Sequence, residues 1–482
     1  MIRRIALCAA LALLGVAQAV PIGPGTPLTR MTPAPGPPTQ RWLLVSDVHF
    51  NPFADATLVD KLAAAPPAGW EAIFTSSAQR TPSGYGTDTN DALLDSALTS
   101  MRLNDPAPLV VVIDGDFLAH GFQSLFDKTA HVHTDAAYRA FVDKTIAYLA
   151  LRFGETFPEA QFVPSIGNND SYCGDYKSAP GSPFLAHFAA AWSPLVHRHG
   201  ASDAADGGAD DFVAGISAAG HYVTDVPGMH LRLVVPNSVV WSANYDDQCG
   251  DPHRNPPQAE LAWLTRTLHR PSAAPTWLVT HIPPGIDVYS SLQGKTPVTT
   301  YAAAYTSAVP DLIDAPWAGV QTVLTGHFHT DGFRIVGFGG PHPVPLLTIP
   351  SISPIFANAP AYVDARVFEA TIVDATTYVL AGLPTLATSG APPALTWDAE
   401  YSYAKDLHLP GLDANGLHAL QDELVSDPAV RTNFEKWFVS GSPVESMTDT
   451  NWPAYWCADV DLTVAAWQTC LAQQPGAAHT QQ

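Results

Sequence analysis

Five short segments of the chain carry side chains of the kinds that bind metal ions, and each follows an apolar run. They are residues 46–49, 114–121, 167–170, 280–285 and 325–331. Their aspartate, asparagine and histidine side chains offer oxygen and nitrogen ligands that suit zinc, manganese or iron. Glycines inside most of the segments let the backbone turn sharply beside a ligand. The pattern predicts a metal site assembled from distant parts of the chain.

The spacing also indicates where such a site lies. In an open α/β sheet, ligands gather beyond the carboxyl ends of the strands, so we expect the five segments to meet at one sheet edge. Taken singly, each motif is also common in ordinary turns. All five occur in order, each after a strand-like run, and this favours a shared metal site.

The chemistry expected of such a site is hydrolysis at phosphorus. Two metal ions about 3.5–4 Å apart share a bridging carboxylate and clamp an in-line displacement. They also lower the pKa of a bridging water, which then attacks as hydroxide near neutral pH. Two dications outweigh the charges of Asp47, Asp116 and one hydroxide, so the centre stays positive. We therefore expect a phosphate to bind at the metals rather than on a basic surface.

Strands and helices that alternate along the chain would position these segments. Compact apolar runs predict strands at 41–46, 109–113, 161–166, 230–235, 277–280 and 320–325, and helical spacing predicts helices at 91–103, 136–153 and 258–269. The strands lack a polar face, which is typical of sheets covered on both sides. The alternation predicts an α/β sandwich with helices outside.

The two ends of the chain differ from the middle in amino-acid composition. Residues 1–19 combine a basic start, an apolar core and small residues near Ala19, which predicts a secretory signal peptide. Residues 20–40 are rich in proline and glycine and read as a tether. We expect a catalytic domain over 41–388 and a mostly helical C-terminal subdomain over 389–482. The mature protein would be secreted or periplasmic, without a transmembrane segment.

Cysteine use agrees with an oxidising compartment. Once Cys8 is removed with the signal peptide, four cysteines remain. We favour Cys457–Cys470, because that loop is short, and Cys173–Cys249 by elimination, although four cysteines allow three pairings. A zinc site is the competing interpretation, but the chain has no Cys-x-x-Cys motif.

The charge balance excludes several classes of partner. Lys plus Arg number 23 against 45 Asp plus Glu, a formal net charge of −22, with no basic cluster. Nucleic acids and anionic membranes are therefore not expected as main partners, and a small phosphoester or phosphoanhydride is. The sequence makes no prediction of the oligomeric state.

The ordered set resembles the calcineurin-like metallophosphoesterases, and within them the acid-sphingomyelinase-like phosphodiesterases. The branch is indicated by a histidine four residues after Asp116, the string at 281–285 and the segment at 350–356. The similarity extends through 366–369 and 397–403. It implies an α/β fold with a metallophosphoesterase β-sandwich flanked by helices in four αββα layers, and a small helical C-terminal subdomain.

The resemblance also implies roles for individual residues. The first metal would be held by Asp47, His49 and His329. The second would be held by Asn168, His281 and His327, and Asp116 would bridge the pair. The family typically binds zinc, although the ligand types also suit manganese or iron. His120 would protonate the leaving oxygen, a role that suits imidazole near neutral pH, or would orient a neighbouring ligand.

Two departures from the family bear on the substrate. Asn169 stands where the family more often has histidine; it can hydrogen-bond a phosphate oxygen but is not an acid near neutral pH. We therefore name Asn169 as a catalytic-site residue beside His120, and the string also resembles endopolyphosphatases of the same superfamily. No saposin-like module precedes the predicted catalytic domain, which favours a soluble phosphoester over bilayer sphingomyelin.

Four further residues lie near predicted ligands in sequence and are candidates to line the substrate cleft: Asn51, Tyr172, Tyr289 and Phe328. Packing around the metal shell is the alternative for the aromatic ones. Three functions follow in order of preference. The first is a secreted sphingomyelinase-like phosphodiesterase with two metals. The second is a hydrolase of polyphosphate or nucleoside polyphosphates, and the third is an extracellular binding module without turnover.

Overall fold

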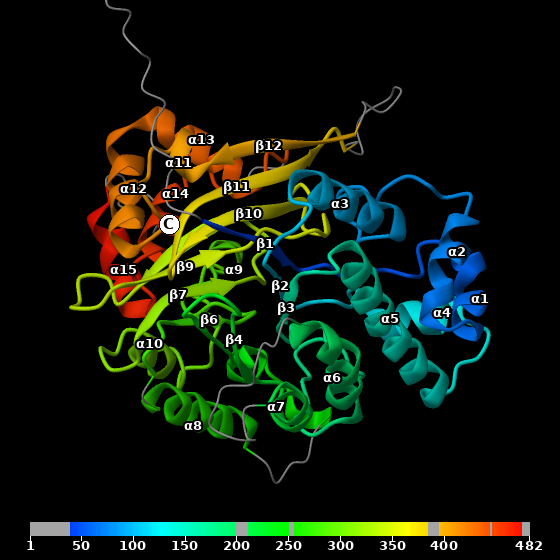
Figure 1. Ribbon diagram of the computed structural model, residues 1–482. Helices are drawn as coiled ribbons and strands as arrows, with labels where there is room; N and C mark the ends of the chain where they lie inside the picture. Colours follow the sequence, from blue (N-terminus) through cyan, green and yellow to red (C-terminus); the bar gives the residue numbers. More distant parts are fainter. Residues whose placement is uncertain are drawn as a thin grey trace, which may run out of the picture. The chain divides into compact units, whose positions relative to one another are not determined.

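Two six-stranded sheets form the centre of the structure, and both contain neighbouring parallel strands (Figure 1). The first sheet contains, in spatial order, β12 (Thr396–Ser402), β11 (Thr371–Ala381), β10 (Ala361–Phe368), β1 (Gln40–Ser46), β2 (Val110–Asp114) and β3 (Gln161–Pro164). The second contains β4 (Tyr222–Asp225), β5 (Arg232–Val235), β6 (Thr276–Val279), β7 (Val320–Thr325), β9 (Val344–Thr348) and β8 (Gly332–Val336).

The coordinates are a computed structural model that describes residues 39–198, 211–249, 255–270, 272–383, 395–443 and 446–474. The predicted signal peptide, all but the end of the predicted tether, and the expected domain boundary near 388 lie outside the described residues. Within those ranges, no helix combines the length and apolar character needed to cross a membrane.

Helices cover the sheets on the sides that face away from each other (Figure 1). Those before β9 are α1 (Val59–Ala64), α2 (Trp70–Thr75), α3 (Asp91–Asn104), α4 (Phe122–Thr129), α5 (Asp135–Thr156), α6 (Pro183–Val196), α7 (Phe212–Ala219), α8 (Pro256–His269), α9 (Val288–Gly294) and α10 (Ala308–Ile313). Side-chain caps begin several of them; at α3 the Asn90 side chain accepts from the amide of Leu93.

The two sheets pack face to face through aromatic side chains. Trp42 of β1 and Trp277 of β6 are fully buried, and their ring centroids lie 5.0 Å apart. The strands of this region are buried on both faces, as β2 illustrates along its whole length. The predicted α/β architecture, with two sheets flanked by helices, is confirmed.

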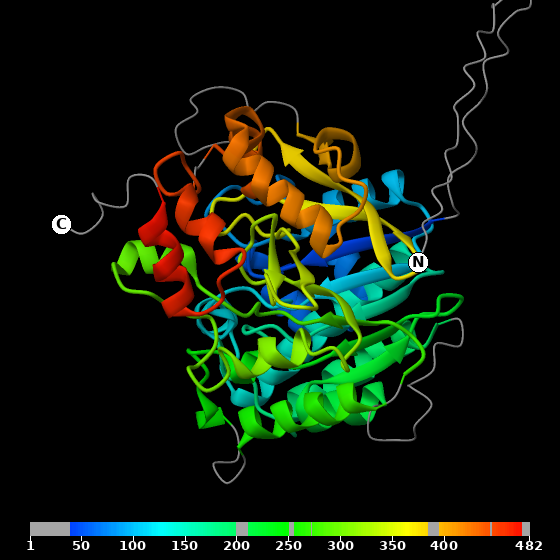
Figure 2. The same ribbon diagram turned by 90° about the vertical axis from the view of Figure 1, so that its left-hand side faces the viewer.

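The six predicted strands and the three predicted helices are present with small shifts of their ends, but β4 and the five strands β8 to β12 were not predicted. Residues 396–402, expected to begin a mostly helical region, form β12, which pairs antiparallel with β11. Helices follow it: α11 (Tyr403–Asp406), α12 (Ala414–Ser426), α13 (Pro428–Phe438), α14 (Trp452–Ala458) and α15 (Val464–Gln473). These orange and red helices gather beside the sheets (Figure 2), and α12 contacts β8 and β9.

Two disulfides join the cysteines in the predicted pairs. Cys457–Cys470 ties α14 to α15, while Cys173–Cys249 joins two loops. The first bond stabilises the helical C-terminal region, and the second lies close to the predicted metal ligands.

Two acidic side chains, the buried Asp331 and the half-buried Glu400, lie close to each other beside β11 and β12. Asp331 accepts hydrogen bonds from the hydroxyls of Thr377 (2.5 Å) and Tyr401 (2.9 Å). Glu400 has a buried carboxylate oxygen with no hydrogen-bond partner among the described residues. Burial, and then the charge of Asp331, raises the pKa of Glu400 to about 9. Both effects favour the protonated form of the Glu400 carboxyl group in the folded protein.

We predict that Glu400→Gln stabilises the protein increasingly as pH rises. Because the folded pKa lies above the ordinary value of 4.5, wild type loses stability between about pH 4.5 and 9. The loss is at most about 1.4 kcal/mol per pH unit, and glutamine removes it. Urea unfolding at pH 5 and pH 8 measures the difference. Glu155→Gln, on an exposed position of α5, is the control; equal effects of the two variants would contradict the prediction.

Candidate metal centre

The five predicted segments follow the carboxyl ends of β1, β2, β3, β6 and β7. The expectation of one sheet edge needs correction, because three of these strands belong to the first sheet and two to the second. Within each sheet the strands are parallel, so their ends are aligned; Ser46 pairs with Asp114, and Val279 with Leu324. The face-to-face packing of the sheets then brings the two edges together.

The backbone at the site is forced into unusual conformations. Five predicted ligands have positive φ, a region that side chains other than glycine rarely adopt: Asp47 (49°), His49 (41°), Asp116 (51°), His327 (71°) and His329 (61°). Such strain is typical of functional sites whose surroundings hold the geometry in place. At Gly326, an added Cβ would collide with the Ser46 hydroxyl and approach Asp47, so only glycine allows the loops this close.

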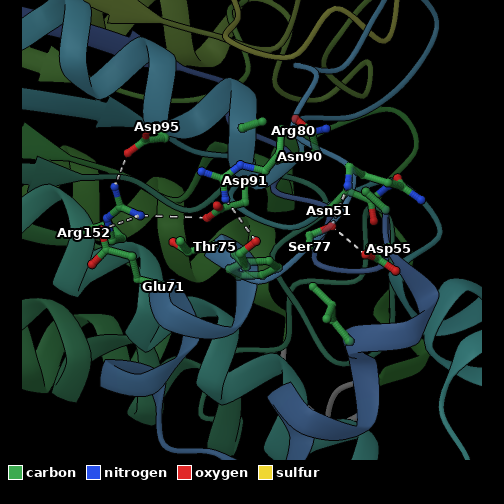
Figure 3. Close-up of a pocket in the computed structure, with 15 residues that line it drawn as sticks. Asn51, Asp55, Glu71, Thr75, Ser77, Arg80, Asn90, Asp91, Asp95 and Arg152 are labelled. Carbon is green, nitrogen blue, oxygen red and sulfur yellow. Dashed lines mark hydrogen bonds and ion pairs between the residues drawn. The ribbon is translucent and has the colours of Figure 1, made fainter.

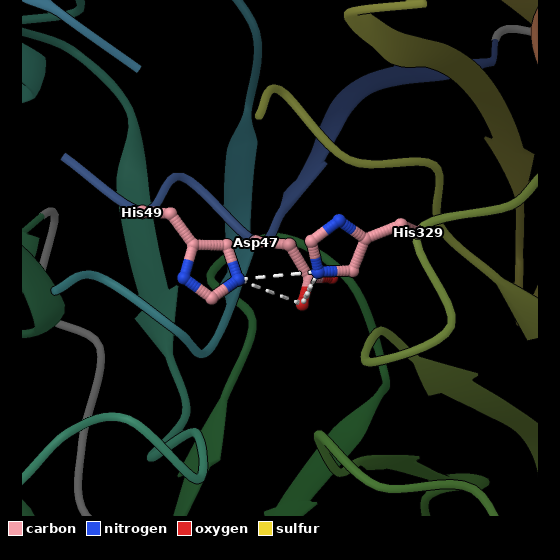
Figure 4. A group of neighbouring side chains, drawn as sticks. All are labelled: Asp47, His49 and His329. Carbon is pink, nitrogen blue, oxygen red and sulfur yellow. Dashed lines mark hydrogen bonds and ion pairs between the residues drawn. The ribbon is translucent and has the colours of Figure 1, made fainter. Parts of the chain in front are cut away.

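The first group of ligands is Asp47, His49 and His329, all buried. The Nε2 atoms of the two histidines lie 3.1 Å apart and turn toward the Asp47 carboxylate (Figure 4). Asp47 Oδ1 is 3.2 Å from His329 Nε2 and 3.7 Å from His49 Nε2. These atoms are close enough together to hold one metal ion.

The second group lies directly beside the first and is joined to it by Asp116. Asp116 Oδ2 is 3.4 Å from Nε2 of both His49 and His281. Asn168 Oδ1 is 3.0 Å from His281 Nε2 and 2.9 Å from His327 Nδ1. The structure thus brings together all seven predicted ligand residues, with Asp116 between the two groups.

Hydrogen bonds on the far side of the rings orient two of the histidines. His49 Nδ1 donates to the Leu118 carbonyl oxygen (3.0 Å), and His281 Nδ1 donates to that of Asp114 (2.7 Å). These bonds leave the Nε2 lone pairs facing the centre, as metal-ligating histidines require. Sequence reasoning did not find these carbonyl partners, because backbone groups carry no sequence signal.

The donor set fits bound cations. Asp47 Oδ1 is buried and has no hydrogen-bond partner among the described residues, and two Nε2 atoms face each other at 3.1 Å. Burial would lower the pKa of His281, yet Asp116 and Asp47 outweigh it and raise that pKa to about 10. The pKa of His49 rises to about 9, also against burial and chiefly because of Asp116. The site thus attracts positive charge, which metal ions would supply while displacing these protons.

His120 and Asn169 lie at the edge of this cluster. The His120 ring stacks on the His49 ring with centroids 4.1 Å apart. Asn169 donates to Asp116 twice, from its backbone amide (2.7 Å) and from its side-chain amide (3.0 Å). Its neighbour Asp170 accepts from the amides of Gly167, Phe117 and Leu118 and so links the loops after β2 and β3.

The four candidate substrate residues lie in different places. Tyr172 is buried, and its hydroxyl donates to Asp143 (2.5 Å) of α5, away from the ligands. Phe328 sits between two ligands in sequence, and the Arg334 guanidinium lies 5.0 Å from its ring centroid. Tyr289 on α9 is 60% exposed. Asn51 accepts from the amide of Phe53 and lines a separate pocket.

That pocket has a volume of about 170 Å³ and is lined by none of the seven ligands (Figure 3). Its Arg152 is neutralised by Asp95 at 2.7 Å, with Asp91 and Glu71 both at 3.9 Å. Arg152 is therefore already paired within the pocket, by three carboxylates that outnumber it.

Two residues beside His120 were not predicted as parts of the site. Phe356 is 63% exposed, and its ring centroid lies 4.7 Å from that of His329 and 5.3 Å from that of His120. Asp88 hydrogen-bonds His120 directly. Phe356 belongs to the segment used to identify the branch, whereas nothing near Asp88 in sequence marks it as special.

The Cys173–Cys249 disulfide braces the loop that carries Asn168. Tyr176, which follows Cys173, donates its amide to the Asn168 carbonyl oxygen (2.8 Å), and the Tyr176 carbonyl accepts from the amide of Asp246 (3.0 Å). The Tyr176 hydroxyl is 3.4 Å from His327 Nε2. The bond thus fixes a segment that touches two ligands of the second group.

Comparison with known proteins identifies this kind of site. The calcineurin-like phosphoesterase family model matches residues 41–331, which contain all seven predicted ligand residues. The chain belongs to that family and is a metal-dependent phosphoesterase. A sphingomyelinase phosphodiesterase D of Dictyostelium discoideum is 25% identical over 74% of this chain and 75% of its own length. The cyclic GMP-AMP phosphodiesterase SMPDL3A of Rattus norvegicus is 22% identical over 72% of this chain and 75% of its own length.

An endopolyphosphatase of Cryptococcus neoformans is also similar, at 27% identity over 37% of this chain and 24% of its own length. The resemblance to calcineurin-like metallophosphoesterases and to their sphingomyelinase-like branch is therefore confirmed. The related endopolyphosphatase agrees with the second resemblance noted for the segment at 167–170.

We predict that replacing Cys173 and Cys249 together by serine weakens metal retention. Loss of the bond frees the Asn168 loop, which we expect to lower metal affinity by about 10-fold and stability by about 2–4 kcal/mol. Competition with a chelator measures the first effect. The matched control replaces Cys457 and Cys470, which tie helices outside the ligand loops, and should cost stability alone. Equal metal loss in both variants would contradict the prediction.

Proposed function

We propose that this chain is a secreted phosphodiesterase that uses two divalent metal ions, with zinc as the expected metal, to hydrolyse a small phosphodiester. The observation that carries the proposal is the assembly of six predicted ligand side chains around a seventh, Asp116. Asp47, His49 and His329 would hold one ion, Asn168, His281 and His327 the other, and Asp116 would serve both. A donor set rich in imidazole with carboxylates suits zinc, and manganese or iron are the alternatives.

When bound, such metal ions polarise the phosphoryl group and lower the pKa of coordinated water. The chain's own residues supply the rest. The His120 ring stands beside the first group of ligands, where it would give a proton to the departing oxygen. Asn169 holds the Asp116 carboxylate in place through two hydrogen bonds. Phe356 forms an apolar wall on the same side as His120.

We also propose the division of the chain that the sequence suggested: a signal peptide at 1–19, a tether at 20–40, a catalytic domain at 41–388 and a helical subdomain at 389–482. The two disulfides support secretion, because such bonds persist in oxidising compartments. A binding module without turnover is disfavoured, since the described residues keep every predicted ligand.

We predict that Asp116→Asn lowers turnover of a chromogenic phosphodiester by about 100-fold or more in metal-reconstituted protein. The amide removes the negative charge shared by the two groups and weakens binding of both ions. Metal analysis of the purified variant accompanies the rate measurement. Asp427→Asn, at the cap of α13, is the control for a carboxylate lost elsewhere. Activity within a few-fold of wild type would exclude the bridging role.

Polyphosphate or a nucleoside polyphosphate is the second candidate substrate. The related endopolyphosphatase and Asn169 favour it. The charge balance opposes it, because 45 acidic residues against 23 basic ones would repel a long polyanion.

We predict that rates fall in the order choline phosphodiester, nucleoside triphosphate, long-chain polyphosphate. The increasing negative charge of these substrates at an acidic surface is the physical reason. The panel is run at matched metal loading and at two salt concentrations, and a cyclic dinucleotide is included because of the named relative. If polyphosphate were the fastest substrate, the result would contradict the prediction and favour the polyphosphate hydrolase.

A further inference from the structure

Both oxygens of the Asp88 carboxylate accept hydrogen bonds from His120. Its Oδ1 accepts from His120 Nδ1 at 3.0 Å, and its Oδ2 accepts from the His120 backbone amide at 2.8 Å. A third hydrogen bond comes from the Ser353 hydroxyl to Oδ1 at 3.2 Å. Asp88 is only 6% exposed, whereas the His120 side chain is 31% exposed. One buried carboxylate thus fixes both the backbone and the ring of a residue at the mouth of the site.

Asp88 is itself held by two other parts of the site. It lies on the loop before α3, where Thr89 donates its amide to the His49 carbonyl oxygen (3.1 Å). Gly86 of the same loop donates to the carbonyl of Pro354 (2.9 Å), next to Ser353. The Asp88 carboxylate is therefore positioned relative to a metal ligand on one side and to the Phe356 loop on the other.

These contacts leave the His120 ring little freedom. One face stacks on His49 at an interplanar angle of 23°, and Phe356 meets the ring edge to face with centroids 5.3 Å apart. The hydrogen bond to Asp88 fixes the remaining rotation of the ring about its bond to Cβ, because it holds Nδ1 on the side of Asp88. With Nδ1 bound to Asp88, Nε2 is the nitrogen that can reach a substrate.

We propose that Asp88 is a positioning residue that orients the His120 ring for protonation of the leaving group. The inference rests on the proposed phosphodiesterase function and extends it. A carboxylate bound to the far nitrogen of a catalytic histidine commonly fixes the orientation and tautomer of the imidazole.

The rival interpretation is that Asp88 is itself a metal ligand, since Asp88, His49 and His120 could together hold an ion. The hydrogen bonds argue against it. Asp88 Oδ1 already accepts from two donors and Oδ2 from a third, and His49 Nε2 faces Asp47 and Asp116. The two interpretations differ in metal content, which the test measures.

The test compares wild type with Asp88→Asn, His120→Gln and the double variant on a series of aryl methyl phosphates, from p-nitrophenyl to unsubstituted phenyl. Loss of a general acid slows poor leaving groups most. We expect Asp88→Asn to lower kcat on the phenyl ester by about 10–100-fold and on the p-nitrophenyl ester by less than about threefold. The double variant should be no slower than His120→Gln alone, because both act through one step.

If Asp88 had a merely structural role, its replacement would lower kcat on both esters by the same factor. A changed dependence of kcat on the leaving group therefore excludes a merely structural role. Ser353→Ala, which removes one hydrogen bond to Asp88, should shift the dependence in the same direction by less. Asp413→Asn, at the cap of α12, should leave it unchanged. Loss of bound zinc from Asp88→Asn would overturn the proposal in favour of a ligand role. A leaving-group dependence unchanged from wild type would also overturn it.

A second readout does not depend on turnover. In protein labelled with ¹⁵N-histidine, the His120 ring signals are assigned from their absence in His120→Gln. Asp88→Asn should shift the Nδ1 signal of His120 and leave those of His49 and His281 in place; an unshifted signal would overturn the proposal. If metal-loaded wild type turns over no ester while this shift occurs, the proposed function fails and the orienting contact stands.

Discussion

The structure depends on the burial of Asp47 and Asp116 next to each other between the two sheet edges. Both side chains are almost fully buried, and burial alone would raise their pKa values. Instead the histidines around them lower the pKa of each carboxyl group. Two neighbouring buried carboxylates need positive charge close by, so the fold itself favours positive charge at this position.

The fold meets this requirement by bringing two sheet edges together, and the C-terminal region keeps them there. The loop after His329 is fixed where Asp331 donates its amide to the Phe438 carbonyl oxygen (3.0 Å). The amide of Ile335 donates to the Asp459 carbonyl oxygen (2.7 Å), and the amide of Ala359 donates to that of Val439 (3.2 Å). The helices that follow β12 therefore hold both the His327–His329 loop and the loop of Phe356, although they supply no ligand.

The sequence was sufficient to predict that these seven side chains lie together, because each predicted ligand comes within a few residues of the end of an apolar strand. Position relative to a strand end is a local signal, and parallel pairing converts it into proximity. Asp88 carries no such signal, because its partner His120 lies 32 positions away and the contact forms only in the folded chain. β12 was missed for a similar reason: its pairing with β11, rather than its own residues, makes it a strand.

The conformation of Asn169 explains why His120 needs such firm support. Where the family more often has a histidine, this chain has an amide, and that amide donates its hydrogen to Asp116. Asn169 therefore stabilises the bridging carboxylate and has no proton to give to a leaving group. In the proposed mechanism the proton would come instead from His120, whose ring contacts Asp88, His49 and Phe356. Because asparagine replaces histidine at position 169, the proposed protonation of the leaving group depends more strongly on the contact between Asp88 and His120.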